Sequence, residues 1–452
     1  MKITGINIGE YRQFKNISFD FTYPADYHDE AKRGKPLEKV CFIGQSGTGK
    51  TTLLNVIWQF IENLMIEIKI QNTIKINSNL NRLMQSKLHL YSISVRQNES
   101  SIEYYRERGS AQAVGYDKYF LSDQSNIGDN TDLITNFLYA DKSSIFIKDS
   151  IAREADAFLV NQKELPKSFS DFVKTTTEAE KDKADFQEWV SKAGSKKTVL
   201  LGDMDSLSTW QYLLNDITNY DETTLSLAST LGRVSEREFG NAIQEFQKKL
   251  SQNPRIELGE KCLNQILEKF FLELNLGGSL NVPIALQTRQ GVKIDSSYLS
   301  TGTRQILATA IPIYKFDTTD TVILFDEPER SLFPDIQRDL VQYYTGLAPT
   351  AQFFFATHSP IIAAAFEPCE RFILDFNEDG EVVCRKGVAP IGDDPNDILS
   401  ADFGMDELMN DDGLAAYERY RNMGVAIRNE QDPTRKQELI VERAKLGDSY
   451  RF

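Results

Sequence analysis

The order of apolar and polar positions along the 452-residue chain predicts strands and helices that alternate at both ends and a polar middle. Period-two alternation and short apolar runs predict strands, and apolar residues three and four apart predict helices. The predicted strands are 2–21 (two strands about a turn at 11–15), 40–43, 88–95 with 99–105, 134–139, 282–294, 321–325, 352–356 and a hairpin of 371–375 with 381–385. The predicted helices are 51–68, 262–276, 303–316, 334–344 and a helical tail after 413 that is broken at Asp432-Pro433. This pattern is typical of an α/β fold.

Composition divides the chain into four predicted parts. Residues 1–145 form a first lobe, 146–255 a polar and mostly helical insertion, 256–390 a second α/β lobe and 391–452 a helical tail. The insertion holds a basic cluster of Lys192, Lys196 and Lys197, which we interpret as a solvated helix face. Sustained heptads are not clear in it.

One glycine-rich loop carries a specific chemical signal. Residues 44–51 read Gly-Gln-Ser-Gly-Thr-Gly-Lys-Thr, match GxxxxGK[ST], and lie between a predicted strand and an amphipathic helix. Such a loop turns backbone N–H groups and a helix N-terminus toward phosphate oxygens. Lys50 can reach the β- and γ-phosphates, and the Thr51 hydroxyl can bind Mg²⁺. The predicted nucleotide-binding residues of this loop are Gly44, Gln45, Ser46, Gly47, Thr48, Gly49, Lys50, Thr51 and Thr52.

A second signal is an apolar strand that ends in two acids, Asp326 and Glu327. We expect Asp326 to reach the Mg²⁺ shell together with Thr51. Glu327 points differently along the pleat, so it is predicted to orient or deprotonate water. The predicted cofactors are therefore ATP and Mg²⁺, and the predicted enzyme class is an ATPase.

Three segments in order resemble ABC-type ATPases. Residues 299–305, Leu-Ser-Thr-Gly-Thr-Arg-Gln, resemble their signature. Residues 326–329, Asp-Glu-Pro-Glu, resemble their extended Walker B motif. Residues 356–360, Ala-Thr-His-Ser-Pro, resemble their switch segment. The long gap between these segments and the phosphate loop is similar to that of the SMC, RecF and OLD-like branch. The resemblance implies an α/β P-loop NTPase with an ABC-type (SMC/RecF-like) head and an inserted helical or coiled-coil arm.

The same resemblance implies a head-to-tail pair of ATPase domains. Ser300 and the Gly302 amide of one copy would cap the nucleotide held at Lys50 of the other, and His358 would act with Lys50 and Glu327 as a catalytic residue. The sequence departs from the family pattern at Thr301, Thr303 and Phe333, and no Q-loop glutamine follows the predicted strand 134–139. The predicted assembly is a homodimer or higher homo-oligomer joined through the heads.

The tail narrows the resemblance. Residues 395–399, Pro-Asn-Asp-Ile-Leu, and 403–405, Phe-Gly-Met, are similar to the segment after the core in ATPase subunits of anti-phage defence systems: Septu, retron-associated systems and, more distantly, PARIS. That similarity implies a sensor or scaffold controlling a separate effector, a nuclease or toxin, with a phage protein or nucleic acid as trigger. Ninety-four residues follow His358 and carry no DxD-type acidic pair, so the effector is expected to be a separate chain.

Charge and hydropathy limit the other possibilities. Acidic residues outnumber basic ones, 66 to 51, which disfavours a uniformly basic nucleic-acid binder. The alternative function is a DNA-repair or chromosome-maintenance ATPase that clamps DNA, and it predicts a local basic stripe. No signal peptide and no membrane span of ~18 apolar residues is found, so we expect a cytoplasmic protein with no membrane partner.

Overall fold

The computed structural model describes residues 2–70, 89–97, 100–107, 119–121, 142–155, 159, 198–202, 207–235, 237–277, 282–405 and 407–452. The strands are β1 (Lys2–Tyr11), β2 (Phe14–Asp20), β3 (Lys39–Gly44), β4 (His89–Gln97), β5 (Ser100–Glu107), β6 (Tyr119–Leu121), β7 (Ser144–Ile147), β8 (Thr198–Leu201), β9 (Leu272–Leu274), β10 (Leu286–Thr288), β11 (Lys293–Ile294), β12 (Val322–Asp326), β13 (Gln352–Ala356), β14 (Arg371–Phe376) and β15 (Val382–Lys386). The helices are α1 (Lys50–Ile70), α7 (Leu207–Leu213), α8 (Asn215–Leu231), α9 (Phe239–Leu250), α10 (Pro254–Leu258), α11 (Asn264–Leu267), α12 (Thr301–Lys315), α13 (Pro334–Leu347), α14 (Pro360–Ala363), α15 (Pro395–Ala401), α16 (Asp411–Asn429) and α17 (Pro433–Tyr450). The predicted strand 134–139 and the lysines Lys192, Lys196 and Lys197 lie outside these residues.

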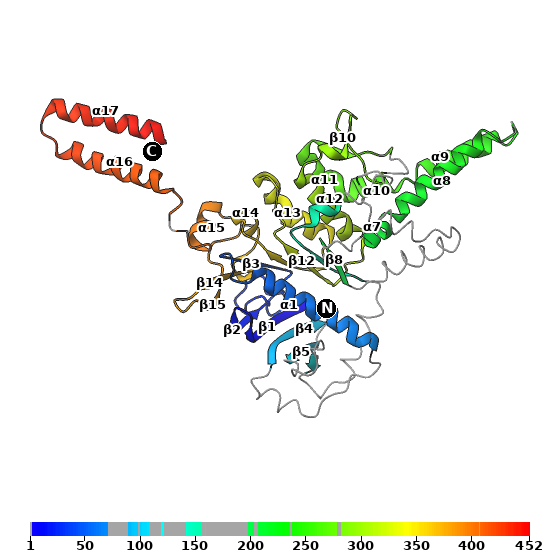
Figure 1. The fold of residues 1–452 in the computed structure, drawn as a ribbon, viewed down its shortest axis with the longest axis horizontal. Helices are drawn as coiled ribbons and strands as arrows, with labels where there is room; N and C mark the ends of the chain where they lie inside the picture. The colour runs from blue at the N-terminus through cyan, green and yellow to red at the C-terminus, as the bar shows by residue number, and fades with distance from the viewer. Residues whose placement is uncertain are drawn as a thin grey trace.

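A seven-stranded sheet runs through the middle of the described chain in the order β15-β14-β3-β13-β12-β7-β8 (Figure 1). β15 is antiparallel to β14, and the other neighbours are parallel. Side chains of β3 alternate between the two faces: Val40 and Phe42 join one core, and Cys41 and Ile43 join the other. Both faces are apolar because both are covered, as is usual for parallel sheets.

One face of this sheet is covered by α1 and by a second, antiparallel sheet of order β2-β1-β4-β5-β6. Phe19 of β2 and Phe21, just after it, contact Phe42, Phe354 and Phe372 of the central sheet, with ring centroids 5.1–6.1 Å apart. Aromatic pairs of this kind bury large apolar area. The packing therefore fixes the β1–β2 hairpin against the sheet beside α1.

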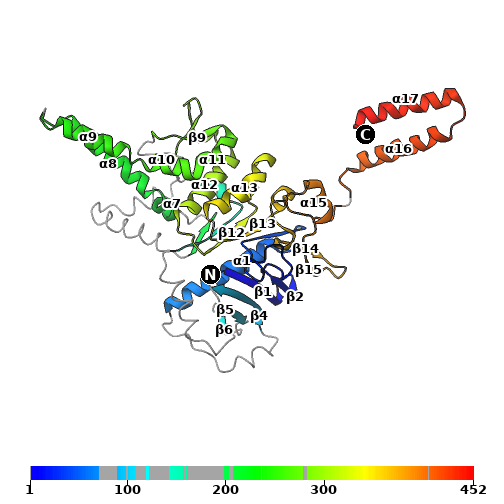
Figure 2. The ribbon, with the colours of Figure 1, turned by 180° about the vertical axis from the view of Figure 1, so that it is seen from behind.

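The opposite face is covered by helices. Buried residues of α12, α13, α14 and α15 join those of α7, α8, α10 and α11 in a single apolar core. α12 contributes an almost continuous buried stretch that includes Ile306, Ala310 and Ile313. The central sheet therefore lies between two layers, a mixed layer with α1 and a helical layer with α12 and α13 (Figure 2).

The predicted helix 262–276 is shorter than expected. A π-helical turn at Gly259–Leu263 leads into α11, and a 3₁₀ turn ends at Phe270. Phe271 then takes φ +58°, and β9 pairs with β10 in a small sheet of order β11-β10-β9. Asn264 Oδ1 accepts a hydrogen bond from the Leu274 amide at 3.0 Å, so the strand folds back onto the helix.

The insertion predicted at 146–255, expected to be mostly helical, contains a strand at residues 198–201. These residues form β8, which pairs in parallel with β7 at the edge of the central sheet. Val199 and Leu201 are buried there, which gives this short apolar run its strand conformation. β7 also crosses the predicted boundary between residues 145 and 146. The projecting part is the pair α8 and α9, which extends from the body beyond α7 (Figures 1 and 2).

The tail has an anchored part and a projecting part. Ile398 of α15 is fully buried in the core, and the Asp402 carboxylate lies 2.8 Å from Nε of Arg371 in β14. Beyond them, α16 and α17 form a hairpin that stands apart from the body in both views (Figures 1 and 2). Part of the segment that resembles defence ATPases thus has a structural role. Within the described residues, no helix has the length and apolarity to cross a membrane.

Candidate nucleotide site

The predicted site residues converge at one edge of the central sheet because β3, β13 and β12 are adjacent and parallel. Phe42 lies opposite Ala356, and Ala356 lies opposite Asp326. The segments that follow these three strands are the phosphate loop, the switch segment and the acidic turn. This crevice beyond the carboxyl ends of parallel strands is where open α/β sheets bind ligands.

The phosphate loop keeps the conformation that its glycines allow. Gly44 and Gly49 have φ of +137° and +101°. A Cβ at Gly44 would meet the Leu374 carbonyl oxygen at 2.0 Å, and one at Gly49 would meet Gln13 Nε2 at 2.1 Å. A residue with a side chain cannot occupy either position without moving its neighbours, so the loop is wrapped closely by β14 and by the β1–β2 turn.

Lys50 is held inside this loop. Its Nζ donates hydrogen bonds to the carbonyl oxygens of Gly44 at 2.9 Å and Gln45 at 3.0 Å. Burial lowers the pKa of Lys50, while Glu327 and Asp326 oppose that shift. The ammonium group therefore lies where an anion bound by the loop would meet it, and it is stabilised by the nearby acids.

The residues present fit a bound Mg²⁺. Thr51 Oγ1 donates to Asp326 Oδ1 at 3.1 Å, which places a hydroxyl and a carboxylate oxygen side by side. Burial raises the pKa of Asp326 to about 6. The hydrogen bond from Thr51 opposes this rise, and the charges of Glu327, Asp149 and Glu329 add to it. The described residues contain no group of three or more His, Cys, Asp or Glu able to hold a metal. Mg²⁺ is usually held by one or two protein oxygens together with nucleotide phosphates and water, which suits this pair.

Glu327 and His358 face each other across the ends of β12 and β13. Glu327 Oε1 lies 4.0 Å from His358 Nε2, and both side chains are about two-fifths exposed, at 41% and 42%. Glu327 takes φ +50°, and its amide donates to the Ala356 carbonyl at 2.9 Å. Burial and the positive charge of Lys50 lower the pKa of His358, while Glu327 opposes them. The lowered pKa favours the neutral imidazole, which has one donating and one accepting nitrogen.

Ser300 and Gly302 lie at the start of α12. Ser300 is exposed and is the N-cap, with Oγ accepting from the Thr303 amide at 3.0 Å. Gly302 is buried, and a Cβ there would meet the Ser331 carbonyl oxygen at 2.6 Å. Gln305, one turn later, donates from Nε2 to the Pro328 carbonyl at 2.8 Å. The signature turn is thereby joined to the acidic turn of its own chain.

Sequence analysis missed several residues of this region. Asp149 follows β7, the strand beside β12, and is paired with Arg330. The signal for this strand was the apolar run at 144–147. Sequence analysis placed a strand at 134–139 instead and did not predict this one. Glu329 belongs to the acidic segment but was given no role, although its Oε1 accepts from the Thr357 hydroxyl and the His358 amide. Gln13, in the β1–β2 turn, donates to the Thr52 hydroxyl at 3.4 Å, a contact between distant segments with no local signal.

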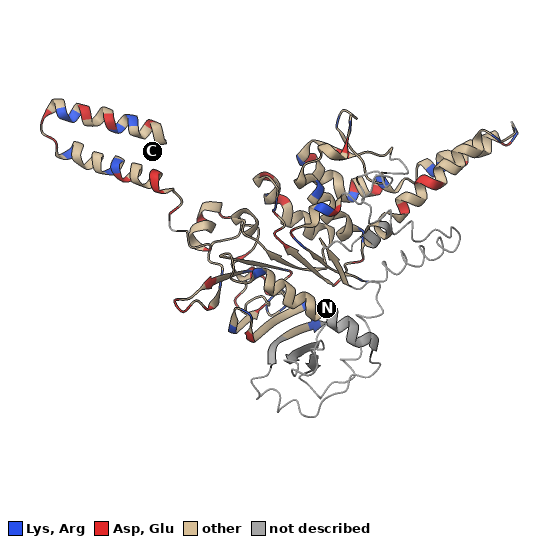
Figure 3. Cartoon of the chain, viewed as in Figure 1, with Lys and Arg blue, Asp and Glu red and all other residues tan. Residues whose placement is uncertain are grey.

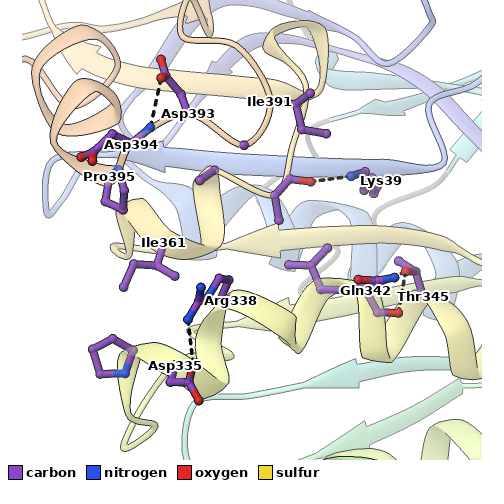
Figure 4. A pocket seen from close by; sticks show the side chains of 15 residues that line it. Lys39, Asp335, Arg338, Gln342, Thr345, Ile361, Ile391, Asp393, Asp394 and Pro395 are labelled. Carbon is purple, nitrogen blue, oxygen red and sulfur yellow. Dashed lines mark hydrogen bonds and ion pairs between the residues drawn. The ribbon is translucent and has the colours of Figure 1, made fainter.

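A cavity of about 750 Å³ lies away from these residues (Figure 4). It is lined by α13, α14, the loop before α15, and Lys39 at the opposite end of β3 from the phosphate loop. Lys39 Nζ donates to the Ala365 carbonyl at 2.5 Å, and Arg338 pairs with Asp335 at 2.7 Å. Its lining contains none of the predicted site residues.

The fold and this site define a P-loop ATPase. A family model described as an AAA ATPase domain matches residues 1–363. The chain therefore belongs to the AAA ATPase domain family, and the predictions of a P-loop fold and of an ATP-hydrolysing enzyme are confirmed. Nucleotide binding follows from the same membership.

Comparison with solved structures finds SMC heads. The chain is 13% identical to an SMC head bound to the C-winged helix domain of ScpA (TM-score 0.40; 85% of this chain, 98% of that one). It is 11% identical to the SMC head domain from Thermotoga maritima (0.38; 86% and 100%), and 13% identical to an Smc head with an extended coiled coil bound to the C-terminal domain of ScpA, derived from Pyrococcus furiosus (0.37; 85% and 96%). No curated protein sequence matches the chain.

Proposed function

We propose that this ATPase is of the ABC type, that two copies close around ATP, and that closure controls a separate effector of a bacterial anti-phage defence system. In each composite site, the phosphate loop of one copy holds the triphosphate and the Ser300 turn of the other covers it. The copies form a homodimer or a higher homo-oligomer in the cytoplasm. The effector is a nuclease or toxin, and a phage protein or nucleic acid is the trigger.

The observation that carries the proposed pairing is the surface around Ser300. Tyr298 is 83% exposed and Phe333 is 72% exposed. These two aromatic residues flank Gly302 and Ser331 in sequence, and Gly302 and Ser331 approach each other closely. Large exposed rings in the two segments that meet at Gly302 and Ser331 are typical of a surface that a partner covers. A second copy of the head is the partner that the nucleotide site calls for.

Each residue of the site has a proposed role in hydrolysis. Lys50 binds the β- and γ-phosphates, and the loop amides with Thr52 complete the cradle. Thr51 and Asp326 hold Mg²⁺, which when bound supplies positive charge to the phosphates. Glu327 orients or deprotonates the attacking water, and His358 contacts the γ-phosphate beside it.

Charge distribution favours a protein partner over a long DNA contact. Figure 3 shows Lys and Arg interspersed with Asp and Glu on the described elements, including both projecting helix pairs. A DNA clamp needs a basic stripe along the groove or arm that follows the phosphates. The tail resemblance to defence ATPases supports the effector-controlling role, and its anchored position beside β14 would let it move with the head.

Mixing two inactive variants tests the composite site. Lys50→Ala removes the phosphate ligand, whereas Ser300→Arg blocks the covering turn and should leave ATP binding by the isolated chain intact. A hydrolysing site needs one good copy of each residue, so a mixture of the two variants should regain about a quarter of wild-type turnover. Two inactive variants that bind to each other and show no regain would overturn head-to-tail pairing.

Trapping the closed state provides an independent test. Glu327→Gln should slow hydrolysis and make the protein dimerise when ATP is added, as measured by light scattering. Faster turnover in that variant would refute the role of Glu327. Co-purification with the nuclease of a neighbouring gene, toxic without this chain, would support the defence role. A steep loss of DNA affinity with salt would instead support the clamp.

A further inference from the structure

A buried carboxylate beside the nucleotide site has a geometry that the proposed chemistry does not use. Glu329 lies in the turn after β12, and its Oε1 accepts hydrogen bonds from the Thr357 hydroxyl at 2.6 Å and the His358 amide at 3.0 Å. Its Oε2 is buried and has no hydrogen-bond partner among the described residues. The side chain thus joins the acidic turn to the switch segment.

The contacts of Glu329 hold the backbone on both sides of the histidine. The His358 amide is bound directly, and the Thr357 hydroxyl that donates to Glu329 also accepts from the Ser359 amide at 2.9 Å. Ser359 Oγ in turn donates to Gln337 Oε1 at 2.6 Å. A histidine whose flanking amides are fixed has few directions in which its ring can point.

Simple stability does not account for a carboxylate at this position. A buried oxygen without a partner costs free energy, and a carboxylate costs more than an amide. Burial accordingly raises the pKa of Glu329, although the bonds from Thr357 and His358 oppose the shift. Residues that break packing rules in this way concentrate at functional sites.

We propose that Glu329 is a positioning residue that fixes the His358 ring relative to Glu327. The proposal rests on the function proposed above, in which His358 and Glu327 act together on the bound triphosphate. In this role Glu329 contacts the switch segment and not the nucleotide or the attacking water. Its effect is transmitted through the backbone of residues 357–359. That backbone places the His358 imidazole 4.0 Å from the Glu327 carboxylate.

A double-mutant cycle tests this proposal. Glu329→Ala should lower kcat about tenfold or more and leave the KM for ATP within about threefold, because ground-state binding does not use the histidine. Glu329→Gln keeps an oxygen that accepts the same two bonds, and it should restore most of kcat. In a His358→Ala background, Glu329→Ala should add less than about a twofold loss, because the ring it positions is gone.

Controls separate positioning from folding. Glu370→Ala removes another buried glutamate, which pairs with Lys39 at 3.4 Å far from the site. It should lower the melting temperature and leave kcat and KM unchanged. If His358→Ala alone keeps wild-type kcat, the histidine role in the proposed function fails. If His358→Ala is impaired and Glu329→Ala multiplies that loss in full, or if Glu329→Gln is as poor as Glu329→Ala, the positioning role alone is overturned.

Discussion

The Gln305 side chain donates a hydrogen bond from Nε2 to the main-chain oxygen of Pro328, at 2.8 Å and buried from water. It joins α12, which begins at the signature turn, to the loop that carries Glu327 and Glu329. Gly302, in the first turn of the same helix, approaches the Ser331 carbonyl oxygen of that loop. A displacement of the Ser300 turn would therefore move the acidic loop with it.

Two glycines in neighbouring helices provide a matched test of this contact. Gly302→Ala places a methyl group 2.6 Å from the Ser331 oxygen and 3.0 Å from Leu332 Cδ2, so the loop must shift. We expect a loss of about 1–3 kcal/mol in unfolding free energy and a marked loss of ATPase activity. Gly346→Ala in α13 meets no atom within 4 Å and should be neutral or slightly stabilising. Wild-type turnover and melting temperature in Gly302→Ala would contradict this picture.

Removal of the phosphate-loop amine should weaken nucleotide binding strongly. Lys50→Ala deletes the group that donates to the Gly44 and Gln45 carbonyls. Nucleotide affinity, measured by titration calorimetry, should fall about a hundredfold or more, since charge-assisted contacts to phosphate are strong. Lys445→Ala, on an exposed position of α17, serves as the control and should bind as the wild type does.

Arg371 and Asp402 test how the tail is attached. Both side chains are fully buried, and Arg371 Nε lies 2.8 Å from Asp402 Oδ2. The two groups form an ion pair without the geometry of a hydrogen bond between these atoms. Asp402 Oδ1 also accepts from the Val388 amide at 2.8 Å. Asp402→Ala leaves the Arg371 charge buried without this partner, so urea unfolding should show a loss of about 3–5 kcal/mol.

A double replacement checks that prediction. Arg371→Met with Asp402→Leu removes both charges, so it should be less destabilising than Asp402→Ala alone. A double variant that is as unstable as the sum of the two single changes would show that shape, and not charge, holds the tail here.

Lys386 predicts a pH dependence away from the nucleotide site. Its Nζ lies 3.4 Å from the centre of the Phe372 ring and donates to the carbonyls of Cys369 and Asp20, at 2.6 and 3.2 Å. Loss of water around the Nζ lowers the pKa of this amine from 10.5 to about 8, although the residue as a whole is exposed. Because the folded state releases the proton first, the contribution of Lys386 to stability is present above pH 10.5 and lost as pH falls through about 8.

The measurement is a comparison of unfolding free energies at several pH values. Relative to Lys386→Met, the wild type should gain stability as the pH rises from about 8 to 10.5. Lys445→Met, at an exposed site, should show no such difference from the wild type. A constant difference between wild type and Lys386→Met over that range would mean that the pKa is not lowered.

Several elements followed from local pattern alone. Short apolar runs predicted the strands around residues 40–43 and 352–356, and an apolar stripe predicted the helix after Lys50. Each of these signals is contained in the residues of the element itself. The phosphate loop is equally local, because its glycines, lysine and threonine must be close in sequence to wrap one phosphate. The hairpin of β14 and β15 and the break before Pro433 are also local signals, and both are confirmed.

Other features depended on segments that are distant in sequence. β8 is four residues in a polar region, and it becomes a strand only because β7 offers a free edge. Asp149 gained its place near Asp326 through the pairing of β7 with β12. Periodicity carries no information about which strand lies next to which, since that is decided by long-range hydrogen bonding and packing.

The sequence by itself determined that this protein has a phosphate-binding loop, an acidic strand end and an α/β pattern, because each is written in neighbouring residues. Only the tertiary structure decided that Glu329 accepts a hydrogen bond from the His358 amide and that Gln305 bonds the signature helix to the acidic turn. It also decided that Arg371 and Asp402 form a buried ion pair. Those contacts join residues from 23 to 31 positions apart. They exist because folding brings the ends of different elements together.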